Sequence, residues 1–249
     1  MSFIADTHVH IYPAHNAAVS LRAGLTNLAA LAPGLPRVLC LTERAECRFF
    51  RDVVSGAVKL PLPFSAIPAG KSAFVAMDNG GEKLFVIAGR QIATGERLEI
   101  SCLGSDEDFP DGISAREAIG RVRDAGGVPV IPWGVGKWLG SRGRLVAELI
   151  GENSDLFAGD SSLRPRGWPE KIFSLHASRT ICGTDPLPAP GAENETGRYA
   201  TIFNAPFDEH DPATSLRAAL RTGNFSNAGE RCGPLEVWRR LRAMKSAGR

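Results

Sequence analysis

The sequence predicts an α/β fold with a mainly parallel sheet, because apolar strand-like runs alternate with helical patterns along most of its length. The first run, Phe3 to His10, predicts a buried strand. A helix follows over Ala17 to Ala32, and Pro33-Gly34 ends it. Arg37 to Thr42 is the second strand, and its unbroken apolar run indicates burial on both faces of the sheet.

The middle of the chain predicts short strands in place of helices. The three candidates are Ala73 to Asp78, Glu82 to Ala88 and Arg97 to Leu103. Turn residues such as Asp78-Asn-Gly-Gly81 and Thr94-Gly95 join them. We expect these strands to add a hairpin at the edge of a barrel.

Helices and strands alternate again after Ser114, where Ser114-Ala-Arg-Glu117 forms a capping box at the start of a helix. The strands expected beyond it are Val128 to Ile131, Leu156 to Ala158, Thr180 to Cys182 and Arg198 to Asn204. The helices expected are Arg142 to Ile150, Trp168 to Arg179, Pro212 to Arg221 and Pro234 to Met244. We expect a single domain over residues 1–249, with its core over about 3–221 and a C-terminal helical extension over about 222–249.

Composition narrows the class of protein. The chain has 249 residues, of which 43% are hydrophobic, so it can bury a sizeable core. A net charge of +2 gives no basic field, and nucleic-acid binding is not implied. No apolar run approaches the ~20 residues that cross a bilayer, so we expect no membrane role. The five cysteines are odd in number and lack a CxxC pair, which favours reduced thiols and a cytoplasmic protein.

The first strand ends in two histidines, His8 and His10. Residues two apart on a strand point to the same side, so the two imidazoles should lie side by side at the strand end. That geometry suits a metal ion that accepts nitrogen ligands, with a carboxylate arriving from elsewhere in the chain. The alternative is two partly buried histidines with a purely structural role.

Other polar residues follow the predicted strands, where α/β folds place their ligand sites. Besides the two histidines they are Glu43, Arg44, Lys137, Asp160 and Asp185. This clustering at the carboxyl ends of several strands favours a functional pocket there.

Several segments, in order along the chain, resemble motifs of the PHP (polymerase and histidinol phosphatase) superfamily. They are Asp6-Thr-His-Val-His10, Leu41-Thr-Glu-Arg44, Ala88-Gly-Arg-Gln-Ile92, Glu99-Ile-Ser-Cys-Leu-Gly104, Asp124-Ala-Gly-Gly-Val-Pro-Val-Ile131 and Gly183-Thr-Asp-Pro-Leu187. The resemblance implies a distorted seven-stranded (β/α)7, TIM-like barrel, here with extra β-hairpin strands. It also implies a metal-dependent phosphoesterase, or a related hydrolase of the amidohydrolase type.

The chain departs from the family's metal site. His8, His10 and Asp185 keep the ligand types of the family, whereas Arg44 replaces a histidine and Gln91 replaces a bridging glutamate. A cluster of two or three metals therefore lacks its ligands here. One divalent ion, zinc, manganese or iron, can be held by two nitrogens and one carboxylate, which leaves an open position for water.

The remaining candidates concern the substrate and the attacking water. Glu43 or Asp160 would orient or deprotonate water. Arg44 and Lys137, with Arg164 and Gln91 beside them, would bind a small anionic substrate. The Gly134-Val-Gly-Lys137 loop could form an anion nest, or it could be a turn that leaves Lys137 in solvent.

Three functions remain open on the sequence. The first is a PHP-like hydrolase that uses one divalent metal on a small anion such as a phosphate ester. The second is a catalytically inactive barrel that binds an anion or a protein partner, favoured by the lost ligands. The third is metal-free lyase or isomerase chemistry at Lys137.

Overall fold

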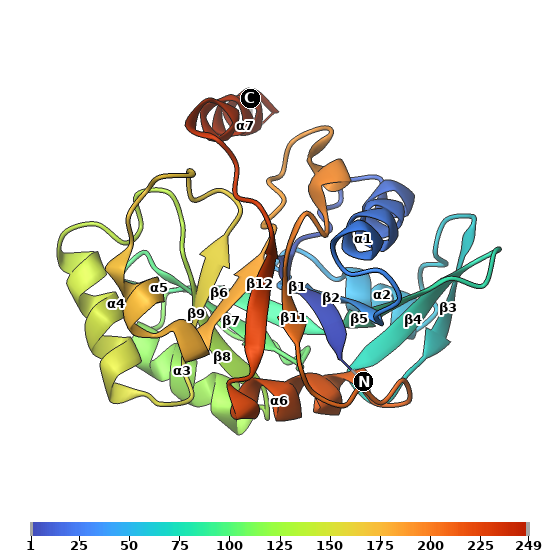
Figure 1. The fold of residues 1–249 in the computed structure, drawn as a ribbon, viewed down its shortest axis with the longest axis horizontal. Helices are drawn as coiled ribbons and strands as arrows, with labels where there is room; N and C mark the ends of the chain where they lie inside the picture. The colour runs from blue at the N-terminus through green and yellow to red at the C-terminus, as the bar shows by residue number, and fades with distance from the viewer. Residues whose placement is uncertain (1, 248–249) are drawn as a thin grey trace.

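The computed structural model describes residues 2–247, which form two mixed β-sheets with helices around them (Figure 1). The larger sheet has seven strands. In spatial order they are β12 (Phe225–Gly229), β11 (Tyr199–Phe203), β1 (Phe3–Val9), β2 (Arg37–Leu41), β5 (Lys83–Ile87), β4 (Ala73–Asp78) and β3 (Phe64–Pro68). The smaller sheet has five, in the order β10 (Thr180–Gly183), β9 (Phe157–Ser161), β8 (Val128–Pro132), β7 (Glu99–Leu103) and β6 (Gly89–Ala93).

The expected (β/α)7 TIM-like barrel is wrong, because the described residues form two separate sheets and no closed barrel. A barrel of that kind needs a parallel strand after each helix. Here β3, β4 and β5 form an antiparallel meander, and β6 pairs antiparallel with β7. These strands follow one another without intervening helices, so the middle of the chain supplies no βα repeats.

The two sheets meet along two seams that carry isolated hydrogen bonds in place of a ladder. At one seam the backbone N–H of Asp185 donates to the carbonyl of His8 over 2.8 Å. At the other, the N–H of Gln91 donates to the carbonyl of Glu43 over 2.8 Å. The seams bring the ends of β1, β2, β6 and β10 to one side of the molecule.

Gly183 allows the close approach at the first seam. A Cβ atom at this position would lie 2.4 Å from the backbone nitrogen of His8 and 2.5 Å from its Cβ. These distances are far inside van der Waals contact, so only glycine lets β10 pack this closely against β1.

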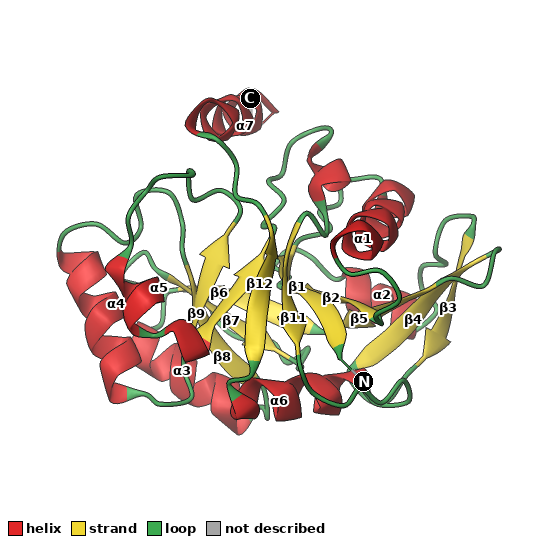
Figure 2. Ribbon diagram, viewed as in Figure 1, coloured by secondary structure: helices red, strands yellow, loops and turns green. Residues whose placement is uncertain are grey.

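The main core lies between the two sheets. Phe3 and Val38 of the larger sheet share it with Val130 and Ile181 of the smaller one. Helix α6 (Pro212–Thr222) closes one end of this core with Leu216 and other apolar residues, and it lies at the bottom of Figure 2.

Two further apolar clusters cover the outer faces of the sheets. Helices α1 (Ala17–Leu31) and α2 (Phe49–Val54) pack on the larger sheet. Helices α3 (Ala115–Asp124), α4 (Ser141–Glu152) and α5 (Lys171–Leu175) pack on the smaller one. Helix α7 (Pro234–Ala247) lies apart from these layers, at the opposite end from α6 (Figures 1 and 2).

Polar side chains cap several of these helices. The Asn16 side chain accepts a hydrogen bond from the N–H of Ala18 at the start of α1. Ser114 accepts one from the N–H of Glu117 over 3.1 Å, as its capping-box pattern predicts. Such caps satisfy backbone donors that the first helical turn leaves unpaired.

One helix and three strands were not predicted from the sequence: α2, β3, β6 and β12. Strand β12 falls in the segment expected to be a helical extension, and its mostly polar, exposed residues carry little strand signal. The helix expected over Trp168 to Arg179 is shorter, because Glu170 caps its start and a 3₁₀ turn over Ala177–Arg179 follows it. In the described part of the chain, every helix is too short or too polar to span a membrane.

Candidate metal centre and adjoining pocket

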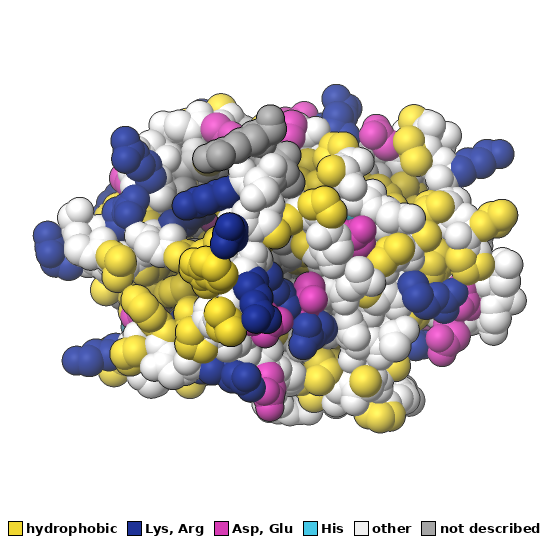
Figure 3. Space-filling model, turned by 90° about the horizontal axis from the view of Figure 1, so that it is seen from above, with side chains coloured by type: hydrophobic (Ala, Val, Ile, Leu, Met, Phe, Trp, Pro, Cys, Tyr) yellow, Lys and Arg dark blue, Asp and Glu magenta, His cyan; other side chains and the backbone are white. Residues whose placement is uncertain are grey.

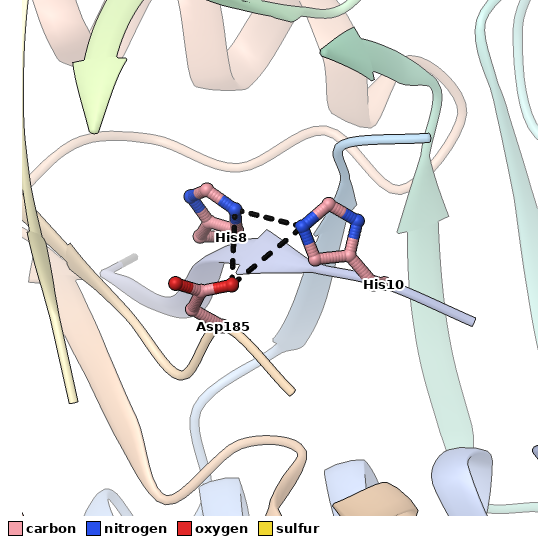
Figure 4. A group of neighbouring side chains, drawn as sticks. All are labelled: His8, His10 and Asp185. Carbon is pink, nitrogen blue, oxygen red and sulfur yellow. Dashed lines mark hydrogen bonds and ion pairs between the residues drawn. The ribbon is translucent and has the colours of Figure 1, made fainter. Parts of the chain in front are cut away.

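His8, His10 and Asp185 converge on one point at the first seam between the sheets (Figure 4). The two histidines come from the end of β1, and Asp185 lies two residues beyond the end of β10. The Nε2 atoms of His8 and His10 are 3.0 Å apart. The Oδ1 atom of Asp185 lies 3.5 Å from the first of these nitrogens and 3.6 Å from the second.

This spacing fits a single metal ion. A triangle with sides of 3.0, 3.5 and 3.6 Å has a circumradius of about 2.0 Å. Zinc binds imidazole nitrogen at about 2.0–2.1 Å and carboxylate oxygen at about 2.0–2.2 Å. An ion just outside the plane of the three atoms therefore reaches all of them, and its outer side stays open for another ligand.

Burial favours the neutral, metal-binding form of the His10 imidazole by lowering its pKa. His8 is 6% exposed and His10 is 3% exposed. Burial holds the pKa of His10 well below its usual value, and the nearby charges of His8 and Arg44 lower it further. A neutral imidazole offers a nitrogen lone pair, whereas an imidazolium cannot coordinate an ion.

Asp185 is held in an unusual backbone conformation. Its φ of 57° lies in the left-handed region, which aspartate tolerates better than most residues but still at a cost. The bond from its N–H to the carbonyl of His8 fixes this geometry. Ser161 Oγ donates to its Oδ2 over 3.2 Å, so Oδ1 is the oxygen that faces the imidazoles. Burial raises the pKa of this carboxyl group.

A cavity of about 230 Å³ adjoins the three donors. His10 and Asp185 lie in its wall, and Tyr12 lines it while its ring stacks on that of His10, with centroids 5.1 Å apart. Its other polar lining residues are Arg44, Gln91, Glu99 and Lys137. Its apolar lining residues are Val135, Leu163, Leu187, Pro188, Leu241 and Met244.

Two cationic side chains, Arg44 and Lys137, line this cavity, and each forms an ion pair with a different glutamate. Lys137 forms an ion pair with Glu99. Arg44 pairs with Glu46 over 3.3 Å, but those side chains are 47% and 58% exposed, so water screens the pair strongly. Arg44 is therefore the cation that can exchange its partner for a bound anion.

The loop that carries Lys137 is a tight turn. The N–H of Lys137 donates to the carbonyl of Gly134 over 2.9 Å, so this donor is used within the loop. The side chain of Lys137 then folds back over Gly134, where a Cβ atom would lie 2.7 Å from Lys137 Cδ. The loop thus presents the charge of a side chain to the cavity, with one of its N–H groups already occupied.

Glu43 is not among the residues that line the cavity. It is 2% exposed, and its Oε1 accepts a hydrogen bond from the N–H of Phe50 at the start of α2. Its Oε2 lies 3.7 Å from Arg90. Burial raises the pKa of Glu43. This carboxylate stabilises the start of a helix and a buried cation.

Asp160 and Arg164 bind each other. Two hydrogen bonds of 2.7 Å join the guanidinium to the carboxylate, and Tyr199 donates a third over 2.9 Å. Ser161, the next residue on β9, contacts Asp185. Because neighbouring strand residues point to opposite faces, Asp160 points away from the candidate metal centre.

Gln91 shares its side of the smaller sheet with Ser101, its antiparallel partner. Gln91 Oε1 and Ser101 Oγ are buried and have no hydrogen-bond partner within residues 2–247. Gln91 also lines the cavity, so water or a bound ligand there can supply the bond that its Oε1 lacks.

Five residues of this site carry no signal of their role in the sequence: Tyr12, Glu99, Ser161 and the α7 residues Leu241 and Met244. Glu99 and Ser101 alternate along β7, so the pattern placed them on one face but could not show which face lines the cavity. Nothing in the sequence of α7 indicates that it folds back over the carboxyl ends of the strands.

No protein-family model and no curated protein matches the chain. Among solved structures, it is similar to PsfC from Pseudomonas syringae PB-5123, with 14% identity, a TM-score of 0.59 and coverage of 99% of both chains. It is also similar to Endonuclease Q bound to a 27-mer duplex with an abasic lesion, with 13% identity and a TM-score of 0.55. That match covers 92% of this chain and 60% of the endonuclease chain.

A third similar structure is the lesion-specific endonuclease PfuEndoQ from Pyrococcus furiosus, with 12% identity and a TM-score of 0.53 over 91% of this chain and 58% of that one. The chain thus spans about three fifths of the endonuclease chains. At this level of identity, the likeness shows a shared fold.

Proposed function

We propose that this protein is a hydrolase that uses one divalent metal ion and acts on a small anionic substrate, such as a phosphate ester. The observation that supports it is the triangle of Nε2, Nε2 and Oδ1 atoms from His8, His10 and Asp185, whose size suits one ion. An ion held there supplies Lewis-acid polarisation and lowers the pKa of water.

The residues that line the cavity have separate roles in binding the substrate and in accepting the proton from water. Arg44 binds the anionic group of the substrate and offsets its charge. Glu99 acts as the base, because it is the carboxylate besides Asp185 among the residues that line the cavity. We prefer it to Glu43 and Asp160, because neither of these two carboxylates lines the cavity. Lys137 is a positioning residue that holds Glu99 by an ion pair.

In the hydrolysis of a phosphate monoester, the oxygen of water forms a bond to phosphorus while the bond from phosphorus to the ester oxygen breaks. Glu99 accepts the proton that water loses, and solvent water supplies the proton that the departing ester oxygen takes up. Arg44 remains on the phosphoryl oxygens throughout. The products are inorganic phosphate and an alcohol.

Metal analysis of the untagged chain tests this proposal. We expect one zinc, manganese or iron ion per chain, its loss in a His8→Ala variant, and its retention in His210→Ala, which removes an exposed histidine away from the cavity. The loaded chain should hydrolyse p-nitrophenyl phosphate, and His8→Ala should not. A chain that binds no ion at any divalent concentration would refute the proposal.

The second candidate is an inactive module that binds an anion. It is favoured by the observation that Glu43 and Asp160 are engaged in structural bonds, which leaves Glu99 and Asp185 as the carboxylates among the residues that line the cavity. Binding of phosphate to a metal-free chain, with no hydrolysis by the loaded chain, would favour this module.

A further inference from the structure

Helix α7 forms part of the cavity wall, although it lies far from the metal donors in the sequence. Leu241 and Met244 sit one turn apart on it, and both line the cavity. Figure 3 looks down on this side of the molecule, where Lys and Arg side chains lie beside hydrophobic ones. The cavity is therefore bounded by the last helix as well as by the strand ends.

Ion pairs hold α7 in place over the strand ends. Arg240 pairs with Glu195, in the 3₁₀ turn Ala192–Glu195, and with Glu236 on its own helix. Val237 is buried, while Trp238 is 54% exposed. These contacts fix the face of α7 that bears Leu241 and Met244 toward the cavity and leave Trp238 in solvent.

The cavity has two kinds of wall. Arg44, Gln91, Glu99 and Lys137 form its polar part, next to the candidate metal centre. Leu241 and Met244 of α7 supply apolar wall, together with Leu187 and Pro188 of the loop after Asp185. A ligand that fills this space meets both charged and apolar side chains.

The volume limits what can enter. At about 230 Å³ the cavity is smaller than the ~300–1,000 Å³ typical of sites for drug-sized ligands. A nucleic-acid duplex cannot fit into such a space beneath a helix. This contrasts with the duplex substrate in the Endonuclease Q complex of similar fold.

We infer that the natural substrate is a small amphipathic anion: its anionic group contacts Arg44 next to the metal donors, and its apolar part packs against Leu241 and Met244. The inference rests on the proposed function for the site's chemistry. It adds a substrate class and makes α7 the element that selects the apolar part.

Calorimetry with two non-hydrolysable probes tests it on the full, zinc-loaded chain. Phenylphosphonate and methylphosphonate share an anionic group and differ in their apolar part. We expect phenylphosphonate to bind at least tenfold more tightly, since a few buried methylene equivalents change affinity by about this factor. The double variant Leu241→Ser, Met244→Ser should reduce this preference to about twofold, and Trp238→Ser should retain it.

Each result decides the inference. Equal affinity of the two phosphonates, or an unchanged preference in the double variant, would overturn the inference. Cleavage of a duplex that contains an abasic site, by a chain that binds neither probe, would also overturn it. Unchanged affinity of the double variant for methylphosphonate shows that it is folded, and Met244→Leu, which keeps the wall apolar, should keep the preference. Selective binding without hydrolysis of phenyl phosphate would support the inference while it refutes the proposed hydrolase.

Discussion

The substitution Gly183→Ala should weaken both the fold and the metal centre, because it inserts a methyl group between β10 and β1. The added Cβ would lie 2.4 Å from His8 N, 2.5 Å from His8 Cβ and 2.9 Å from His8 Cα. Ordinary carbon contacts need about 3.5–4.0 Å, so the strands must separate by about 1 Å. The rigid backbone on both sides leaves no flexible side chain to move aside.

The size of the effect follows from what is lost. Overpacking of this kind costs about 1–3 kcal/mol. Separation also weakens the bond from Asp185 N–H to His8 O and the bond from Thr7 Oγ1 to Cys182 O, each worth about 1 kcal/mol. We therefore expect the free energy of unfolding to fall by about 2–4 kcal/mol. A shift of Asp185 by about 1 Å also takes Oδ1 beyond zinc-bonding distance, so zinc affinity should fall at least about tenfold.

Urea denaturation of the apo chain and competitive zinc titration measure these two quantities. Gly120→Ala is a matched control, because a Cβ at this position in α3 meets nothing within 4 Å. It should leave zinc affinity unchanged and stabilise the chain by about 0.5–1 kcal/mol. A Gly183→Ala chain that matches the unsubstituted chain in both stability and zinc affinity would show that β10 and β1 do not need a glycine at this contact.

Four further substitutions separate the structural residues from the functional ones. Arg164→Met should lower the free energy of unfolding by about 3–5 kcal/mol in urea denaturation, because it leaves the buried Asp160 carboxylate without its cation; a loss below about 1 kcal/mol would contradict this. Glu99→Gln should lower kcat for an aryl phosphate by about 10²–10⁴-fold in steady-state assays, whereas Glu43→Gln should change it less than about fivefold; the reverse ranking would return the base to Glu43. Arg44→Met should raise KM by about tenfold or more, and an unchanged KM would remove it from substrate binding.

The convergence of the candidate ligands could be predicted from the sequence because it rests on local rules. Alternation along a strand puts His8 and His10 on one side, and polar residues after parallel strands gather at one edge. Asp185 follows β10, so these rules also placed it near the histidines. What they could not give is the seam itself, which depends on Gly183 and on the left-handed backbone of Asp185.

The division into two sheets and the bonding partners of Glu43 and Asp160 depend on contacts between residues that are not neighbours in a local sequence pattern. The polar strand β6 and the edge strand β12 have weak patterns, yet their pairings decide how the sheets divide. The bond between Asp160 and Arg164 forms only once the chain turns after β9. Similarly, Glu43 is bound by the N–H of Phe50 after the chain enters α2. A carboxylate that follows a strand is therefore only a candidate catalytic residue. Its hydrogen-bond and ion-pair partners in the folded chain decide whether its role is catalytic or structural.

Anomalous diffraction from a zinc-soaked crystal would locate an ion bound by His8, His10 and Asp185. We expect one peak at about 2.0–2.2 Å from the Nε2 atoms of His8 and His10 and from Asp185 Oδ1, with an open side toward the cavity. The absence of a peak between these three atoms at saturating zinc, or a peak bound only by other residues, would contradict it.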